Sequence, residues 1–165
     1  LTGVPVHIAG GDGVHYTPMS GDNVVWRGHL DAAALKEFYR NARCIVIPSR
    51  WQEAFGLVAA EAMMHGVPVV AARIGALPEV VEDGVTGLLF EPGNAWELAQ
   101  QMMRLWSDAG ESRKLGTAGR GKALRLYTPE AYRQKVLAAY EAASTAEPYF
   151  EDASVIPADD RVGAA

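Results

Sequence analysis

The stretch PSRWQEAFGLVAAEAMMHGVPVVA, residues 48–71, contains the pattern from which the fold follows. It begins where an apolar run, residues 44–48, ends, and it passes through a short polar loop into a helix predicted over 56–65. Gly66 suits the left-handed residue that ends many helices. A second apolar run, residues 67–72, follows. Neither run alternates with polar residues, which predicts two strands buried on both faces of a parallel sheet.

Short strands and amphipathic helices continue to alternate on either side of this stretch. Strands are predicted at residues 4–9, 23–27 and 87–90, and helices at residues 32–42, 78–82, 95–106, 111–126 and 129–143. This alternation favours a doubly wound, parallel α/β sheet with right-handed crossovers. In such sheets, ligands bind beyond the carboxyl ends of the strands.

Two of the predicted helices carry clear side-chain patterns. The helix over 32–42 follows Asp31, a good N-cap, and carries Leu35, Phe38 and Tyr39 on one face. The helix over 95–106 carries an apolar stripe that includes methionine and tryptophan, and we interpret this stripe as core. After residue 143 the periodicity ends, which predicts one ordered domain over 1–143 and a flexible tail over 144–165.

The composition is that of an ordinary globular protein. Of the 165 residues, 49% are hydrophobic and 21% charged, and the net charge is −5. Basic residues and aromatics do not cluster, so nucleic acid is not an expected partner. The single cysteine, Cys44, lies in an apolar run, which favours a core thiol and a reducing compartment. The chain begins at Leu1 without a methionine or a basic leader, so we expect a cytoplasmic fragment of a longer protein.

Two carboxylates frame the start of the helix predicted over 56–65. Glu53 precedes it and Glu61 lies in its second turn, at the sheet edge where ligands bind. The first amide groups of a helix have no intrahelical partner, and together with the helix dipole they favour anionic ligands. The neighbours of Glu61 are small or apolar, so we expect a largely buried carboxylate that needs hydroxyl donors. The residues alone leave a capping or salt-bridging role equally open.

The segment around these glutamates resembles a known family. EAFGL at residues 53–57, EAMMHGVPVV at residues 61–70 and GALPEVVEDGVTGLLFEPG at residues 75–93 are similar to the E-x7-E region of retaining family-4 (group 1) glycosyltransferases. The resemblance covers roughly residues 4–143. It implies the Rossmann-like C-terminal half of a GT-B fold, incomplete at its N-terminus, which binds a nucleotide sugar for retaining transfer to a glycan, lipid or other acceptor, as in polysaccharide biosynthesis.

The resemblance also implies roles for individual residues. Glu61 would hold the ribose hydroxyls, and Glu53 would contact the transferred sugar as the catalytic carboxylate. The implied donor-binding set is completed by Ala54, Phe55, Gly56 and Leu57, and the implied nucleobase side by Gly28, His29 and Leu30. The donor would be of UDP or GDP type. No cofactor or metal is expected, because the sequence has no paired aspartates and no His/Cys cluster with ligand spacing.

The family pattern extends beyond this chain. Its acceptor domain, and the Arg and Lys that bind the diphosphate, would precede Leu1, so we expect a fragment that binds donor without transferring sugar. The full-length enzyme would meet its acceptor through that domain, with peripheral contact at the inner face of the membrane. Two alternatives stay open at this point: a GT-B-shaped sugar-nucleotide epimerase or phosphorylase, and a nucleotide-binding domain without activity.

Overall fold

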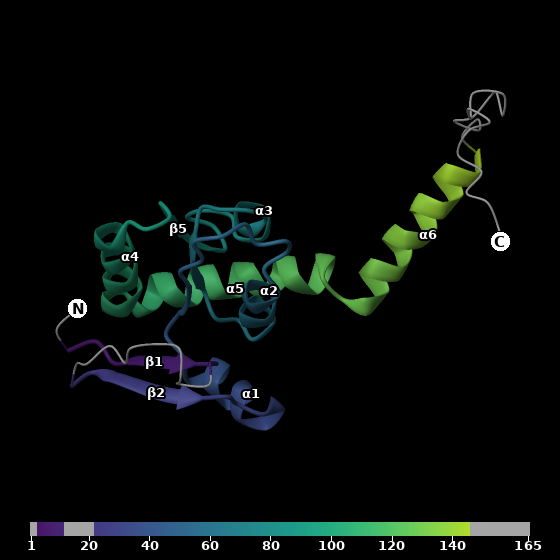
Figure 1. The fold of residues 1–165 in the computed structure, drawn as a ribbon. Coiled ribbons are helices and arrows are strands. Elements are labelled where there is room, and N and C mark those ends of the chain that lie inside the picture. Colours follow the sequence, from purple (N-terminus) through teal and green to yellow (C-terminus); the bar gives the residue numbers. More distant parts are fainter. Residues whose placement is uncertain (1–2, 12–21, 146–165) are drawn as a thin grey trace, which may run out of the picture. The chain divides into compact units, whose positions relative to one another are not determined.

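The computed structural model describes residues 3–11 and 22–145 and divides the chain into two compact units, Leu1–Thr128 and Pro129–Ala165 (Figure 1). The first unit holds, in chain order, β1 (Val6–Ala9), β2 (Val24–Gly28), α1 (Ala32–Asn41), β3 (Ile45–Ile47), α2 (Leu57–Met64), β4 (Val69–Ala72), α3 (Leu77–Val80), β5 (Gly87–Phe90), α4 (Ala95–Ser107) and α5 (Ala109–Leu126). The second unit holds α6 (Pro129–Thr145).

These elements follow the predicted order, and their ends differ from the predicted ones by a few residues. The predicted N-cap of α1 is in place, since Asp31 Oδ1 accepts a hydrogen bond from the Ala34 amide at 2.8 Å. Gly66 follows the end of α2 with φ +74°, the left-handed conformation expected there. The tail predicted over 144–165 lies outside the described residues from residue 146 onward.

All strand pairs in the described part of the chain are parallel. β1 pairs with β2, and β4 lies between β3 and β5 in a second hydrogen-bonded group. Val69 of β4 is opposite Ile45 on one side and Gly87 on the other. Parallel strands joined through helices confirm the α/β class.

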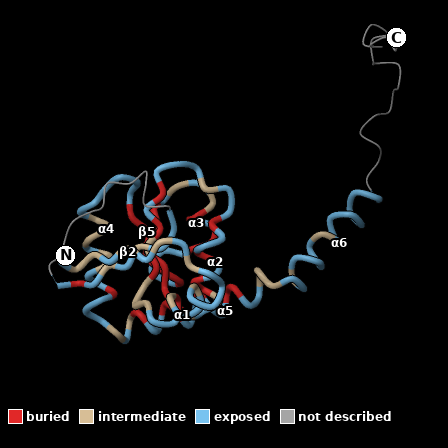
Figure 2. Tube along the Cα trace, turned by 60° about the horizontal axis from the view of Figure 1, so that its bottom comes forward, coloured by how far each residue is buried: buried red, intermediate tan, exposed pale blue. Residues whose placement is uncertain are grey.

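The centre of the second group, β4, is buried on both faces, as the lack of polar alternation predicts. Figure 2 shows buried stretches of the chain gathered around β5, α2 and α3. Val69 and Ala71 belong to one apolar cluster and Val70 and Ala72 to another. The helical residues of the first cluster come mainly from α2 and α3. Those of the second cluster are Leu105 of α4 and Leu115 of α5. The three-stranded group is therefore covered by helices on both sides.

The apolar stripe of α4 is only partly core, which corrects the prediction. Leu105 is fully buried, but Trp96 is 73% exposed, and Met103 and Trp106 are both 39% exposed. The stripe is wider than the surface of α4 that β4, β5 and α5 cover. Trp106 instead lies beneath the guanidinium of Arg43, 5.8 Å from the ring centroid.

The second unit, within the residues that are described, consists of α6. This helix has no buried residue, and Tyr132 and Tyr140 are 70% and 72% exposed. Across residues 3–11 and 22–145, no helix combines the length and the apolar character that a membrane crossing requires.

Candidate functional site

The candidate site lies where β3 and β4 end. The loop after β3 leads into α2, and the connection after β4 leads into α3. Because the two strands are parallel neighbours, both connections leave the same edge of the sheet. A backbone hydrogen bond joins them, from the Ala76 amide to the Glu53 carbonyl at 2.9 Å. The predicted carboxylate therefore sits on a loop that is anchored from the adjacent strand.

Two glycines allow these connections to approach so closely. Gly56, the N-cap residue of α2, has φ +83°, and a Cβ there would lie 2.8 Å from Leu77 Cδ2. Gly75 has φ +58°, and a Cβ there would overlap the backbone nitrogen and carbonyl oxygen of Glu53. Both positions need a left-handed backbone and no side chain, which only glycine provides without strain.

Glu53 is held through one carboxylate oxygen. Ser49, which is 7% exposed, donates from Oγ to Glu53 Oε1 at 2.6 Å. The half-buried Glu53 has no further side-chain hydrogen bond to any described residue, so its second oxygen can accept a hydrogen bond from another donor. Sequence reasoning missed Ser49, although its position four residues before Glu53 was visible.

Glu61 is exposed, and the prediction that it is largely buried was wrong. The buried side of α2 carries Ala59, Ala62 and Met63, and Glu61 projects from a different side of the helix. Its donor is a protein group, because the Tyr39 hydroxyl donates to Glu61 Oε2 at 2.9 Å. The only signal for Tyr39 in the sequence was a polar atom on an otherwise apolar helix face.

The first turn of α2 presents free amide groups between these carboxylates. The amides of Ala59 and Ala60 already bond to the Gly56 carbonyl, at 2.9 and 3.2 Å, whereas those of Leu57 and Val58 meet no acceptor among the described residues. Gly56 supplies no side-chain cap. The turn is therefore open to an oxygen-rich or anionic ligand.

The rest of the predicted donor-binding set lies on the same short segment. Ala54, Phe55 and Leu57 are exposed, with Leu57 at 67%. The Phe55 ring meets Tyr127 edge to face, with 5.5 Å between centroids. The structure thus brings residues 53–57 together at the start of α2, with Glu61 one turn beyond Leu57.

The predicted nucleobase side lies in the connection after β2. Gly28 ends that strand with φ +64°, and His29 and Leu30 lie between it and α1. This is again the carboxyl end of a parallel strand. Within the described part of the chain, these residues make no hydrogen bond, ion pair or ring contact with α2, so their role stays a prediction.

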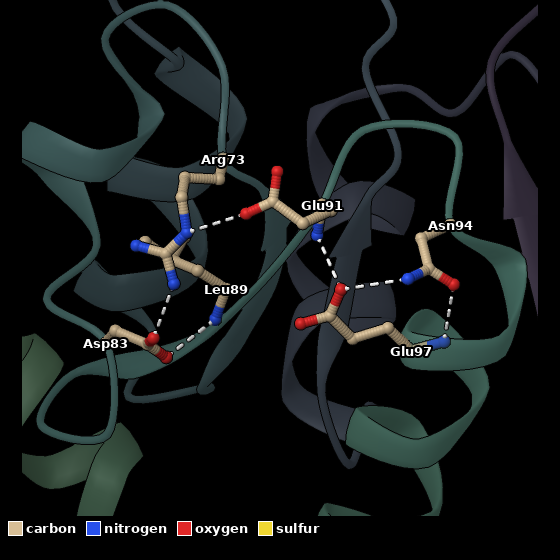
Figure 3. Close-up of polar contacts among 6 residues, drawn as sticks. All are labelled: Arg73, Asp83, Leu89, Glu91, Asn94 and Glu97. Carbon is tan, nitrogen blue, oxygen red and sulfur yellow. Dashed lines mark hydrogen bonds and ion pairs between the residues drawn. The ribbon is translucent and has the colours of Figure 1, made fainter.

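A cation at the same sheet edge is already engaged by acidic partners. Arg73 follows β4, and its guanidinium meets Asp83 at 2.7 Å and Glu91 at 3.3 Å (Figure 3). The hydrogen bond to Asp83 is the main reason that the pKa of Arg73 is raised. The other oxygen of Asp83 accepts from the Leu89 amide at 2.9 Å. Arg73 is therefore paired with two carboxylates, one before β5 and one directly after it.

The polar groups at this edge of the sheet are carboxylates, hydroxyls and backbone amides. Among the residues that the structure describes, no group of three or more His, Cys, Asp or Glu side chains could hold a metal ion. The chemistry open to the site is recognition of hydroxyl groups by Glu53 and Glu61, and of anionic or polar oxygens by the amides between them.

Comparison with known proteins gives a consistent result. A family described as Glycosyl transferases group 1 matches residues 19–122. The D-inositol 3-phosphate glycosyltransferase of Streptomyces bingchenggensis is 38% identical over 117 residues, which are 71% of this chain and 23% of that protein. The chain spans about a quarter of the length of the curated relatives it matches.

Solved structures agree with the sequence relatives. Sucrose-phosphate synthase from Thermosynechococcus elongatus aligns with a TM-score of 0.67 and 37% identity, over 76% of this chain and 32% of that chain. Anabaena HepE, solved in complex with UDP-glucose, aligns with a TM-score of 0.67 and 26% identity, over 73% of this chain and 33% of that chain.

Proposed function

The chain belongs to the group 1 glycosyl transferases, and we propose that it is the part of a retaining transferase that binds the nucleotide-sugar donor. One observation carries the proposal: the open first turn of α2 lies between Glu53 and Glu61, and a protein hydroxyl holds one oxygen of each carboxylate. The same helix start therefore offers amides for a diphosphate and carboxylates for hydroxyl groups.

The proposed roles follow the order of groups in a nucleotide sugar. Glu61 accepts hydrogen bonds from the ribose hydroxyls, and Glu53 accepts them from the transferred sugar. The amides of Leu57 and Val58 face the diphosphate or the sugar hydroxyls. Gly28, His29 and Leu30 form the nucleobase side.

The chemistry assigned to the whole enzyme is transfer with retention. The bond between the anomeric carbon and the diphosphate oxygen breaks, a bond to the acceptor oxygen forms on the same face, and the acceptor's proton leaves with the departing diphosphate. Charge develops on that diphosphate, so donors aimed at it favour the transition state. The amides of α2 supply part of this stabilisation in our proposal.

We assign the donor to the UDP or GDP type, with UDP first, because HepE was solved with UDP-glucose. The acceptor, a glycan or a lipid, belongs to the part of the longer enzyme outside residues 1–165. We place that enzyme in the cytoplasm, at the inner face of the membrane. The 165-residue chain alone is expected to bind donor and to release no diphosphate from it.

Calorimetry on the 165-residue chain tests the donor assignment. Glu61→Ala is expected to lower the affinity for UDP or GDP at least tenfold, which corresponds to about 1.4 kcal/mol, because the ribose loses its acceptor. Glu53→Gln is expected to lower the affinity for a nucleotide sugar more than the affinity for the nucleoside diphosphate without its sugar.

Glu141→Ala is the matched control, because Glu141 is an exposed glutamate on α6. It is expected to change neither affinity. Unchanged nucleotide affinity in Glu61→Ala, or no nucleotide binding by the parent chain, would overturn the proposed function.

A further inference from the structure

Tyr39 connects α1 to the carboxylate that we assign to ribose. It lies 22 residues before Glu61 in sequence, and its hydroxyl donates to Glu61 Oε2 at 2.9 Å. The side chain is 4% exposed, whereas Glu61 is exposed. A buried group on one helix therefore holds an exposed group on the next.

The Tyr39 ring is fixed from more than one side. It stacks on the His65 ring, with 5.1 Å between centroids and 15° between planes. It also belongs to the apolar cluster that contains Ala62 and Met63 of α2. The hydroxyl oxygen is consequently held in a set position relative to α2.

The Tyr39 hydroxyl is also a permanent donor. Burial, and then the hydrogen bond to Glu61, raise the pKa of Tyr39 well above its ordinary value. The phenol therefore keeps its proton throughout the neutral range, and its one hydrogen points to a carboxylate. Glu61 Oε2 is occupied in this way, and the other oxygen has no hydrogen-bond partner among the described residues.

We propose that Tyr39 is a positioning residue that holds Glu61 in the orientation that accepts the ribose hydroxyls, an inference that rests on the proposed function. An exposed glutamate on a helix samples several rotamers, and a ligand that needs one of them loses affinity in selecting it. The hydrogen bond from Tyr39 holds Glu61 in one rotamer before the nucleotide binds, so that binding does not include the cost of fixing the side chain. Its effect should be confined to ligands that carry ribose hydroxyls.

Tyr39→Phe tests this by removing the hydroxyl while keeping the ring and its stack on His65. We expect the affinity of the chain for UDP, or for GDP if that is the better ligand, to fall about threefold to tenfold. The affinity for the 2′,3′-dideoxy analogue of the same diphosphate should not change. Tyr132→Phe is the matched control, because Tyr132 is 70% exposed on α6, and it should alter neither affinity.

Two further variants separate this proposal from the proposed function. Glu61→Asp retracts the carboxylate from the Tyr39 hydroxyl and is expected to give the same ribose-specific loss. Glu61→Ala is expected to abolish the preference for ribose, and adding Tyr39→Phe to it should have no further effect. Unfolding in urea checks that each variant folds.

The outcomes are distinct. If Glu61→Ala leaves nucleotide affinity unchanged, the proposed function fails. If Glu61→Ala abolishes the ribose preference while Tyr39→Phe and Glu61→Asp retain it in full, the proposed function stands and the positioning role of Tyr39 is overturned. An equal loss for the ribo and dideoxy ligands in Tyr39→Phe also overturns that role, because a general packing defect predicts it.

Discussion

Gly75 is the residue on which the position of the Glu53 loop depends. A Cβ at Gly75 would overlap the Glu53 backbone, and φ is +58°. We expect Gly75→Ala to lower the free energy of unfolding by about 3 kcal/mol or more, because left-handed strain and steric overlap add. Urea unfolding measures this loss, and calorimetry should show weaker nucleotide-sugar binding.

Gly84 provides the control for the strain alone. Its φ is +72°, and a Cβ there would meet no atom within 4 Å. Gly84→Ala is expected to cost about 1 kcal/mol and to leave binding unchanged. Equal losses in the two variants would show that the contact with Glu53 contributes nothing.

Cys44 gives a direct test of burial at the start of β3, because the chain has one cysteine. Burial raises the pKa of the Cys44 thiol to about 11. At pH 8, alkylation of the folded chain by iodoacetamide should be about a hundredfold slower than in urea, because only the thiolate reacts. The folded rate should still be rising steeply at pH 10, where the unfolded rate is already close to its plateau. A plateau near pH 9 in the folded chain would contradict the shift.

Residue positions in the site were predictable where a motif carried them. Glu53, Glu61 and the residues between them form one short stretch of sequence, and the strand–loop–helix pattern placed that stretch at a sheet edge. Tyr39 and Ser49 carry the hydroxyls that hold these carboxylates, and neither was predicted. The Tyr39 contact spans two helices, and the pattern of either helix alone gives no information about their packing.

At the scale of elements, α5 makes a close backbone contact with the turn between α2 and β4, at the end of α2 opposite the candidate site. A Cβ at Gly116 would overlap the Gly66 carbonyl and lie 3.2 Å from Pro68 Cδ, where α2 turns into β4. Gly116→Ala should therefore lower the free energy of unfolding by about 2 kcal/mol, since the helix must move away from that turn. Urea unfolding is the measurement.

Gly121, on the same helix, is the matched control. A Cβ there would meet nothing within 4 Å. Gly121→Ala is expected to raise stability by about 0.5 to 1 kcal/mol, because alanine favours the helix more than glycine does. The two substitutions are predicted to change the free energy of unfolding in opposite directions. Destabilisation of equal size in both would rule out the close contact as the cause.

The boundaries of elements were predictable to the extent that local signals set them. Asp31 and Gly66 mark helix ends through their own backbone and side-chain chemistry, so α1 and α2 were recognised closely. The stripe of α4 was misjudged because the width of an apolar stripe does not reveal how much of it another element covers. Trp96 and Trp106 are exposed for that reason.

At the scale of the whole molecule, the α/β class followed from alternation and from strands without polar residues. The burial of all four residues of β4 bears this out. The division after Thr128 had no comparable signal, because the predicted helix over 129–143 looked like a continuation of the domain. The structure distinguishes the two helices, because α5 has six buried residues and α6 has none.

The hydrogen bond from the Ala76 amide to the Glu53 carbonyl has a consequence for evolution. A main-chain bond is indifferent to the side chains that its two residues carry. Any residue except proline can therefore replace Ala76 without loss of the bond that anchors the Glu53 loop. Variation of the side chain at position 76 and the position of the Glu53 loop are in this way separable, so descendants of one ancestral domain can change the first without losing the second.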